Sequence, residues 1–359
     1  MRTLLGSAAG AATVTLAMSS VAVAAEPSPT LYGIRPLGMG NAFVAAADDR
    51  NALYYNPARL GAVTSWSISG VGVQGRLDET FPDVVQFIED NEEEFENFDT
   101  VDSSFYDELA PYDNRWVSAE AQSYMDMVKP GLGLGIYTSG SASLKIDRGV
   151  YEPRVYERVL NDIVAVAGAS MDLGRMDLTG GAAVKGIWRR TSDRVFTARE
   201  VADFDADVIV DELQKAEEGF AMDWGLNYQR PDARWNVSAV WHDSFGFVAG
   251  EPIQSGFDVG AAWRPSVPSG GVIRSVLLAA DLKNMFQGEA FGTMAHFGAE
   301  VRIPLISLRG GFNQGYASAG ASLHIPFLSA HYAYFGQELG SVPGAEQQNL
   351  HAVEVRLGF

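Results

Sequence analysis

A closed antiparallel β-barrel that spans a membrane is the all-β fold class that the sequence predicts. Three observations predict it: an apolar leader, the absence of any later apolar stretch long enough for a transmembrane helix, and strands of alternating polarity that end on an aromatic carboxyl-terminal residue. A leader implies export, which leaves two classes, a soluble periplasmic or secreted protein and an outer-membrane barrel. The alternation together with the leader favours the barrel, and so the outer membrane of a Gram-negative bacterium.

The leader covers residues 1–24, which we interpret as a signal peptide. Arg2 is the only charge before Glu26, and the apolar run closes on Ala22-Val23-Ala24, a small-x-small cleavage site. The alternative is a transmembrane anchor. Small and polar residues within the run disfavour it, among them Gly6, Ser7, Gly10 and Thr13.

Composition excludes several function classes. The net charge is −19, which argues against nucleic acid as a partner because phosphate binding requires Lys and Arg. There are no cysteines, so a disulfide framework, a thiolate nucleophile and a zinc ribbon are ruled out. None of the five histidines sits in a nucleophile or metal motif, and we therefore expect no catalytic residues, no metal and no cofactor.

The last ten residues have the length and polarity of one membrane-crossing strand. Phe359, Leu357 and Val355 fall on one face, while Glu354 and Arg356 fall on the other. We expect this strand to close the barrel, with its apolar face toward lipid. Barrels of outer membranes resemble one another in this aromatic end, which the outer-membrane assembly machinery reads.

Similar runs upstream raise the number of candidate strands to 13. Single-chain bacterial barrels have even strand numbers, so 12 or 14 are expected and 14 is favoured. The other candidate strands are 64–75, 131–138, 161–172, 177–190, 218–229, 234–243, 254–264, 277–283, 295–303, 306–313, 316–325 and 327–336.

Two segments break the strand rhythm and are predicted to be helical excursions outside the membrane. Residues 77–114 hold 14 acids and no Lys or Arg, with apolar residues at helical spacing. The second excursion is 191–217, helix-like from Thr197. The acidic excursion is either a solvated loop or a contact surface for lipopolysaccharide or a partner.

Residues 33–61 are unusually rich in small side chains. Gly38 and Gly40 permit close packing or positive φ, Asp48 and Asp49 end a run of alanines, and a turn follows at Asn56-Pro57-Ala58. These residues suit a compact element in a confined space.

This stretch resembles the N-terminal segment of the FadL-type superfamily of outer-membrane long-chain fatty acid transporters. The late motifs 280–282, 296–300 and 308–313 also resemble the superfamily and its TraF-like and PorV-like relatives. The resemblance implies that residues 25–63 form a hatch inside the lumen and that 64–359 form the barrel. Arg59 departs from the pattern, since the transporters usually have Gly there, and this leaves the fatty-acid substrate open.

The resemblance implies two functions. The first is a channel for uptake of hydrophobic compounds such as long-chain fatty acids, with the hatch around Gly38, Gly40 and Asn56 to Ala58 as the moving part. The alternative is a non-transporting barrel that serves as a docking or assembly component in secretion or conjugation. The corresponding partners are outer-membrane lipid and lipopolysaccharide, a hydrophobic small molecule, and a secretion-system protein.

Charged residues recur on the inward face of the late strands. Because a charge facing lipid costs a few kcal/mol, these must face the lumen. We predict either an interior ion-pair ladder that anchors the hatch through Arg35 or Asp49, or independent water-screened charges. The six residues are Asp281, Glu300, Arg302, Arg309, Glu354 and Arg356.

Overall fold

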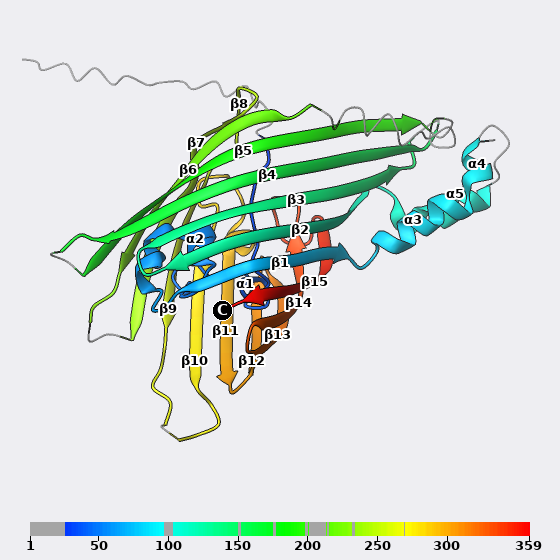
Figure 1. The fold of residues 1–359 in the computed structure, drawn as a ribbon. Helices are drawn as coiled ribbons and strands as arrows, with labels where there is room; N and C mark the ends of the chain where they lie inside the picture. The colour runs from blue at the N-terminus through cyan, green and yellow to red at the C-terminus, as the bar shows by residue number, and fades with distance from the viewer. Residues whose placement is uncertain are drawn as a thin grey trace, which may run out of the picture.

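Fourteen long antiparallel strands form a closed barrel in the computed structural model, which describes residues 26–96, 103–149, 152–174, 177–197, 200, 213, 215–231, 234–268 and 270–359. Each strand pairs with its neighbours along the chain, and β1 pairs with β15 to close the ring (Figure 1). The favoured number of 14 is therefore confirmed. The signal peptide predicted at 1–24 lies outside the described residues.

The strands are β1 (Ser67–Asp78), β2 (Arg115–Lys129), β3 (Leu132–Asp147), β4 (Arg154–Asp172), β5 (Leu178–Thr197), β6 (Glu217–Tyr228), β7 (Trp235–Val248), β9 (Gly256–Trp263), β10 (Ser275–Leu282), β11 (Ala295–Ile303), β12 (Ile306–Asn313), β13 (Tyr316–Ile325), β14 (Leu328–Glu338) and β15 (Gln347–Gly358). A further two-residue strand, β8 (Glu251–Pro252), pairs with the end of β7 and takes no part in closing the barrel.

The terminal strand β15 shows why these residues form a barrel wall. Val355, Leu357 and Phe359 are all more than half exposed on the outer face. Glu354 is buried on the opposite, inward face. The backbone N–H of Phe359 donates to the carbonyl of Ile68 at 3.0 Å, and the N–H of Ile68 donates back at 2.7 Å, which ties the chain end to β1.

Strand β2 is the one long strand that the alternation did not predict. Its outward residues Ala119, Ala121 and Ser123 are small, so the apolar half of the pattern is weak. Its inward residues Tyr124 and Asp126 contact the segment inside the barrel. Contacts on the inner face therefore compensate for the low hydrophobicity of the outer face.

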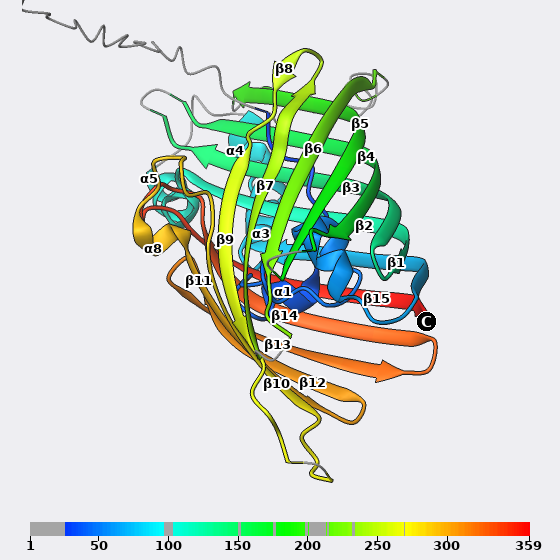
Figure 2. The same cartoon turned by 90° about the vertical axis from the view of Figure 1, so that its left-hand side faces the viewer.

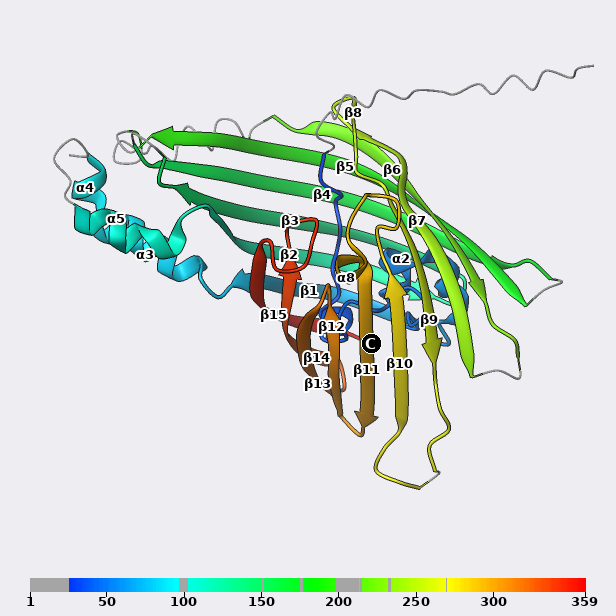
Figure 3. The ribbon, with the colours of Figure 1, turned by 180° about the vertical axis from the view of Figure 1, so that it is seen from behind.

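The barrel has one end with long loops and one with short turns. Strands β4 and β5 have 19 and 20 residues, about twice the 9–11 that a tilted strand needs to cross the membrane. Their surplus length projects at the long-loop end (Figures 1 and 3). The connections there include the short helices α8 (Phe291–Met294) and η3 (Ala110–Tyr112).

The acidic excursion is helical, comprising α3 (Phe81–Asp90), α4 (Glu92–Glu96) and α5 (Ser103–Leu109). These helices extend sideways from the ends of β1 and β2 (Figure 3). Their apolar faces share a small hydrophobic core with the outer face of the projecting strands. It contains Val84, Phe87, Phe95, Phe105, Leu109, Val117, Ile146 and Val155. The acidic faces are left to solvent.

The second predicted excursion, 191–217, is wrong in its bounds. Residues 191–197 continue β5, where they pair with β4 up to Thr197 opposite Arg154. Charged and polar residues such as Asp193 and Arg194 occur in this part of β5, which exceeds the length of a membrane-crossing strand. Most of residues 198–216 lie outside the described residues.

Residues 26–63, here called the plug, lie inside the barrel (Figures 1 and 2). The plug begins at the long-loop end, where Glu26 forms a β-bridge with Ile253, and descends to α1 (Ile34–Leu37). It continues through α2 (Ala52–Tyr55) and η1 (Pro57–Ala62) toward β1. Its apolar side chains form the main hydrophobic core together with inward residues of the wall.

Candidate functional site

The turn at Gly38 to Gly40 packs directly on a glycine-lined patch of the wall. A Cβ atom at Gly298 would lie 2.2 Å from the carbonyl oxygen of Met39, and one at Gly311 would lie 2.7 Å from the nitrogen of Gly40. Gly40 itself has a φ of 62°, which favours glycine. The glycines of two late motifs are therefore needed because plug backbone touches wall backbone there.

A second glycine patch receives the Asn56-Pro57-Ala58 turn on the wall of β5 and β6. A Cβ atom at Gly181 would lie 2.2 Å from the nitrogen of Ala58, and one at Gly225 would lie 2.1 Å from Oδ1 of Asn56. Asn56 accepts from the N–H of Ala58 at 3.0 Å and donates to the carbonyl of Val44 at 3.1 Å. Hydrogen bonds within the plug therefore fix the shape of the turn, and its backbone packs directly against the wall at Gly181 and Gly225.

Arg35 is the centre of a buried charge cluster in the plug. Its Nη1 donates to Asp48 and Asp49 at 2.6 Å each, and its Nε and Nη2 donate to both carboxylate oxygens of Glu300 on β11 at 2.8 Å. Burial by itself raises the pKa of Asp48, but the attraction of Arg35, Arg302 and Arg264 outweighs it and holds that pKa below its usual range. The cluster is therefore ionised at neutral pH.

Three of the six charged residues predicted to line the lumen, Glu300, Arg302 and Arg309, form one hydrogen-bonded cluster. Glu300 accepts from Arg309 Nε at 2.6 Å and from Arg302 Nε at 2.7 Å, in addition to Arg35. Glu300 and Arg309 are directly opposite each other in the β11–β12 register. Whether this cluster rigidifies the wall and anchors the plug remains a prediction.

The other three predicted charges do not extend a ladder. Asp281 accepts instead from the backbone N–H groups of Phe43 and Val44, at 2.6 and 2.8 Å. Arg356 donates to the hydroxyl of Ser329 at 3.3 Å. Asp281 lies opposite His296 on β11, and Arg356 lies opposite Ser329 on β14, so neither has an arginine or a carboxylate directly across the register.

Glu354 belongs to a second charged contact, which the sequence pattern did not reveal. It accepts from the hydroxyl of Tyr124 and lies 3.7 Å from Nη1 of Arg50. Arg50 Nε also donates to Asp126 on β2 at 2.6 Å. Arg50 directly follows the Asp48-Asp49 pair. A basic residue next to two acids in a segment of small side chains was the sequence feature that could have predicted this contact.

The sequence did not predict that Arg59 contacts the barrel wall, although its departure from the family pattern had singled it out. It is almost completely buried, and its Nε donates to the carbonyl of Ala47 at 2.9 Å. Its Nη1 donates to the side-chain oxygens of Asn227 at 3.1 Å and Gln229 at 3.3 Å. A buried guanidinium needs such acceptors.

The plug separates two cavities in the lumen. The one toward the long loops has about 490 Å³ and is lined by polar and charged side chains, including Lys185, His242, Asp258 and Lys283. The one toward the short turns has about 330 Å³, and six arginines are among its lining residues. Among the described residues, no group of histidines and acids is arranged to hold a metal ion.

No described helix is long and apolar enough to span a membrane.

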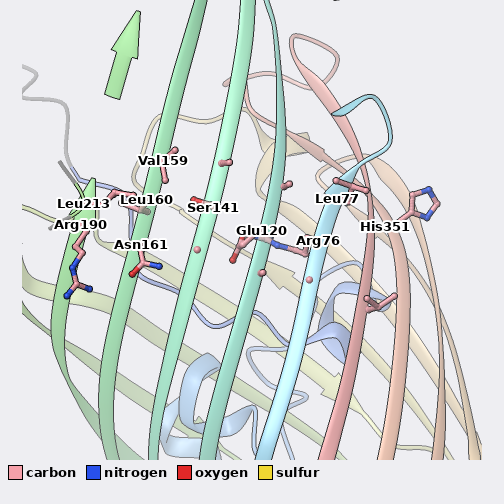
Figure 4. A pocket seen from close by; sticks show the side chains of 16 residues that line it. Arg76, Leu77, Glu120, Ser141, Val159, Leu160, Asn161, Arg190, Leu213 and His351 are labelled. Carbon is pink, nitrogen blue, oxygen red and sulfur yellow. The ribbon is translucent and has the colours of Figure 1, made fainter. Parts of the chain in front are cut away.

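Two larger hollows lie on the outer wall. One has about 940 Å³ and follows β15 and β1 to β5, with Leu77, Val159 and His351 among its lining residues (Figure 4). The paired side chains of Arg76 and Glu120 connect β1 and β2 beside this hollow (Figure 4), but they belong to the inward face, where Arg76 lies over the ring of Tyr32 in the plug.

The second hollow has about 700 Å³ and is almost entirely apolar. It lies over β4 to β7 and is lined by Met171, Gly180, Trp224, Leu226 and Trp241, among others. Its floor includes Gly181 and Gly225, whose inner sides carry the Asn56-Pro57-Ala58 turn.

No protein-family profile and no curated protein matches the chain. Solved structures do resemble it. The Pseudomonas putida toluene transporter TodX matches with a TM-score of 0.53 at 12% identity, over 92% of this chain and 98% of that one. A deltaS2 mutant of the TodX monoaromatic hydrocarbon channel matches with a TM-score of 0.51 at 12% identity, over 91% and 97%. At this identity the likeness shows a shared barrel fold.

Proposed function

We propose that the chain is an outer-membrane channel of a Gram-negative bacterium that takes up hydrophobic compounds. The fold supports this, because its likeness to a toluene transporter extends over nearly the whole of both chains. The proposed compound class is broad and includes both aromatic hydrocarbons and long-chain fatty acids. We propose no catalytic role, since no nucleophile or metal motif occurs in the sequence.

The observation that carries the proposal is the apolar hollow over β4 to β7. At Gly181 and Gly225 a single layer of backbone separates this hollow from the plug. The outward neighbours Trp224, Leu226 and Trp241 are exposed where lipid would cover them. A hydrophobic compound needs an apolar path, and this is where the plug comes closest to an apolar exterior.

The test is an uptake assay in a strain that lacks its own channel for the compound. Labelled toluene and a labelled long-chain fatty acid are each offered to cells with the wild type, the Asn56→Ala/Pro57→Ala variant or an empty vector. The double variant removes the hydrogen bonds that shape the turn, so we expect changed uptake with an intact barrel. Pro231→Ala, in the turn after β6, is the matched control and should behave as wild type.

A second function, a docking or assembly component, is favoured by one observation: charged side chains line both lumen cavities. In that case the acidic helices α3 to α5 would present the partner surface, and lipopolysaccharide is the other candidate contact. The TraF-like and PorV-like resemblance remains a prediction. Equal uptake in wild type, double variant and empty vector, with the barrel present in the membrane, would favour docking.

A further inference from the structure

The cavity at the short-turn end lies between the plug and the late strands. The plug contributes Arg35, Asp49, Arg50 and Asn51. The wall contributes inward residues in a register row across five adjacent strands, which runs Arg302, Ser307, Ser322, His331 and Glu354. Because neighbouring strands are about 4.8 Å apart, this row forms a continuous polar surface beneath the plug.

This cavity is basic in an acidic protein. It is lined by six arginines and only two acids, Asp49 and Glu354, whereas the chain as a whole carries a net charge of −19. Some of this positive charge is neutralised from just outside the lining, by Glu300, Asp48 and Asp126. The six arginines are Arg35, Arg50, Arg274, Arg302, Arg309 and Arg356.

Two of these guanidinium groups are buried and only partly satisfied. Arg50 is 3% exposed and Arg309 is 7% exposed, yet Nη2 of each has no hydrogen-bond partner among the described residues. Arg309 donates through Nε to Glu300 and through Nη1 to Ser322. Arg50 donates through Nε to Asp126, and its Nη1 lies 3.7 Å from Glu354. A buried donor left unpaired is costly, so each free Nη2 calls for an acceptor.

The acceptor must be an anion to suit this surface. Guanidinium nitrogens bind carboxylates and phosphates with charge-assisted hydrogen bonds, which are shorter and stronger than neutral ones. Arg356 adds a third donor on the same wall, since among the described residues its hydrogen bond goes to the hydroxyl of Ser329. The hydroxyl of Ser322 forms a 2.7 Å hydrogen bond with His331 and accepts from Arg309, so it helps to hold the Arg309 side chain in position.

We propose that this cavity is a binding site for a small oxyanion, a carboxylate or phosphate group, held by Arg50, Arg309 and Arg356. The group has two possible sources. It is either the carboxylate of a hydrophobic cargo, a source that rests on the proposed function, or a free inorganic anion from the compartment that the short turns face.

Binding is measured by calorimetry on the purified mature protein in neutral detergent at low ionic strength. The probes are octanoate, its uncharged analogue octanol, and inorganic phosphate. The variants are Arg309→Gln and Arg356→Gln, each tested for a folded barrel by its heat-dependent gel migration. Arg356 is only half-buried, so its variant keeps the test valid if Arg309→Gln does not fold. Arg158→Gln, an exposed arginine on β4 paired with Asp193, is the matched control.

We expect at least one anion to bind wild type and Arg158→Gln equally, and to bind Arg356→Gln about tenfold more weakly, because one charge-assisted hydrogen bond is lost. Octanol should bind without any dependence on the arginines. Octanoate that binds at least tenfold more tightly than phosphate identifies the cargo carboxylate as the ligand, whereas phosphate that binds as tightly as octanoate or more tightly identifies a free inorganic anion. The proposal is overturned if neither anion binds, or if both arginine variants bind as wild type does. Because no uptake is measured, failure here is distinct from failure of transport.

Discussion

Removal of Glu300 is the change that most directly tests how the plug is held. This carboxylate is almost completely buried and accepts hydrogen bonds from Arg35, Arg302 and Arg309 at 2.6–2.8 Å. In the Glu300→Ala variant two buried arginines lose a shared counter-ion. Arg35 keeps Asp48 and Asp49, whereas Arg309 keeps only the hydroxyl of Ser322.

The expected loss follows from that burial. Breaking a buried pair by removing one partner costs about 3–5 kcal/mol, since the other charge is left uncompensated. Arg309→Ala should cost less, because Glu300 retains Arg35 and Arg302. In the double variant no unpaired arginine remains at position 309, so the combined loss should fall short of the sum by about 1–3 kcal/mol.

The assay is equilibrium unfolding of the wild type, both single variants and the double variant in lipid vesicles, followed by tryptophan fluorescence. Arg158 and Asp193 provide the control cycle, because they are paired at 2.9 Å but are 55% and 57% exposed. Their coupling should stay under about 1 kcal/mol. A coupling between Glu300 and Arg309 no larger than that of the control pair would refute the reasoning.

Three further predictions concern packing, the lipid face and pH. Gly311→Ala should destabilise the barrel by about 1–3 kcal/mol, because its Cβ would lie 2.3 Å from the carbonyl oxygen of Phe297; Gly310→Ala, whose nearest neighbour is 3.9 Å away, should leave the unfolding midpoint unchanged. Val355→Lys should cost about 2–4 kcal/mol if the site is near the membrane midplane, and Gln347→Lys at the loop end of the same strand about 0–1; equal costs would show that β15 does not face lipid. Because the pKa of Asp48 is lowered in the folded protein, its contribution is complete above its usual pKa of about 3.9 and is lost as pH falls through the lowered value. Acid unfolding should therefore begin below about pH 4 and be less steep in Asp48→Asn, and an unchanged slope in that variant would contradict the assignment.

The strand pattern was predictable because it depends on residues close together in the chain. Alternation at Val355, Leu357 and Phe359 already assigns the outer face, and burial agrees with it. Strand β2 was missed where that local signal fails, since Ala119 and Ala121 are too small to mark a lipid face. Its assignment required its neighbours, to which it is paired along its whole length.

The contacts of the plug were less predictable because they depend on register between distant strands. Alternation correctly placed Asp281, Glu300 and Arg309 on the inward face, but it does not tell which of them are neighbours. The register places Glu300 opposite Arg309, and it places Asp281 opposite His296. Asp281 therefore meets plug backbone rather than an arginine.

The two sides of the plug are attached to the wall with different strength. Toward β10 and β11, Arg35 is paired with Glu300, and the N–H groups of Phe43 and Val44 donate to Asp281. Toward β6, the described contacts of Arg59 are with the neutral amides of Asn227 and Gln229, at 3.1 and 3.3 Å. An ion pair between two buried charges is stronger than hydrogen bonds from one charged group to neutral amides, so residues 56–62 should open before residues 35–44.

Cysteine labelling tests this order, because the chain contains no native cysteine. Ala42 and Ala58 are both alanines of the plug, 0% and 1% exposed, so Ala42→Cys and Ala58→Cys are closely matched probes. A small thiol reagent reaches either one only when its part of the plug opens, and its rate then reports the free energy of that opening. Ala121→Cys on the exposed outer wall measures the unhindered rate. We expect Ala58→Cys to react faster than Ala42→Cys, and Glu300→Ala to accelerate Ala42→Cys in particular. Equal rates at the two sites would show that the plug opens as one body, and a faster rate at Ala42→Cys would show that the charged side is the weaker attachment.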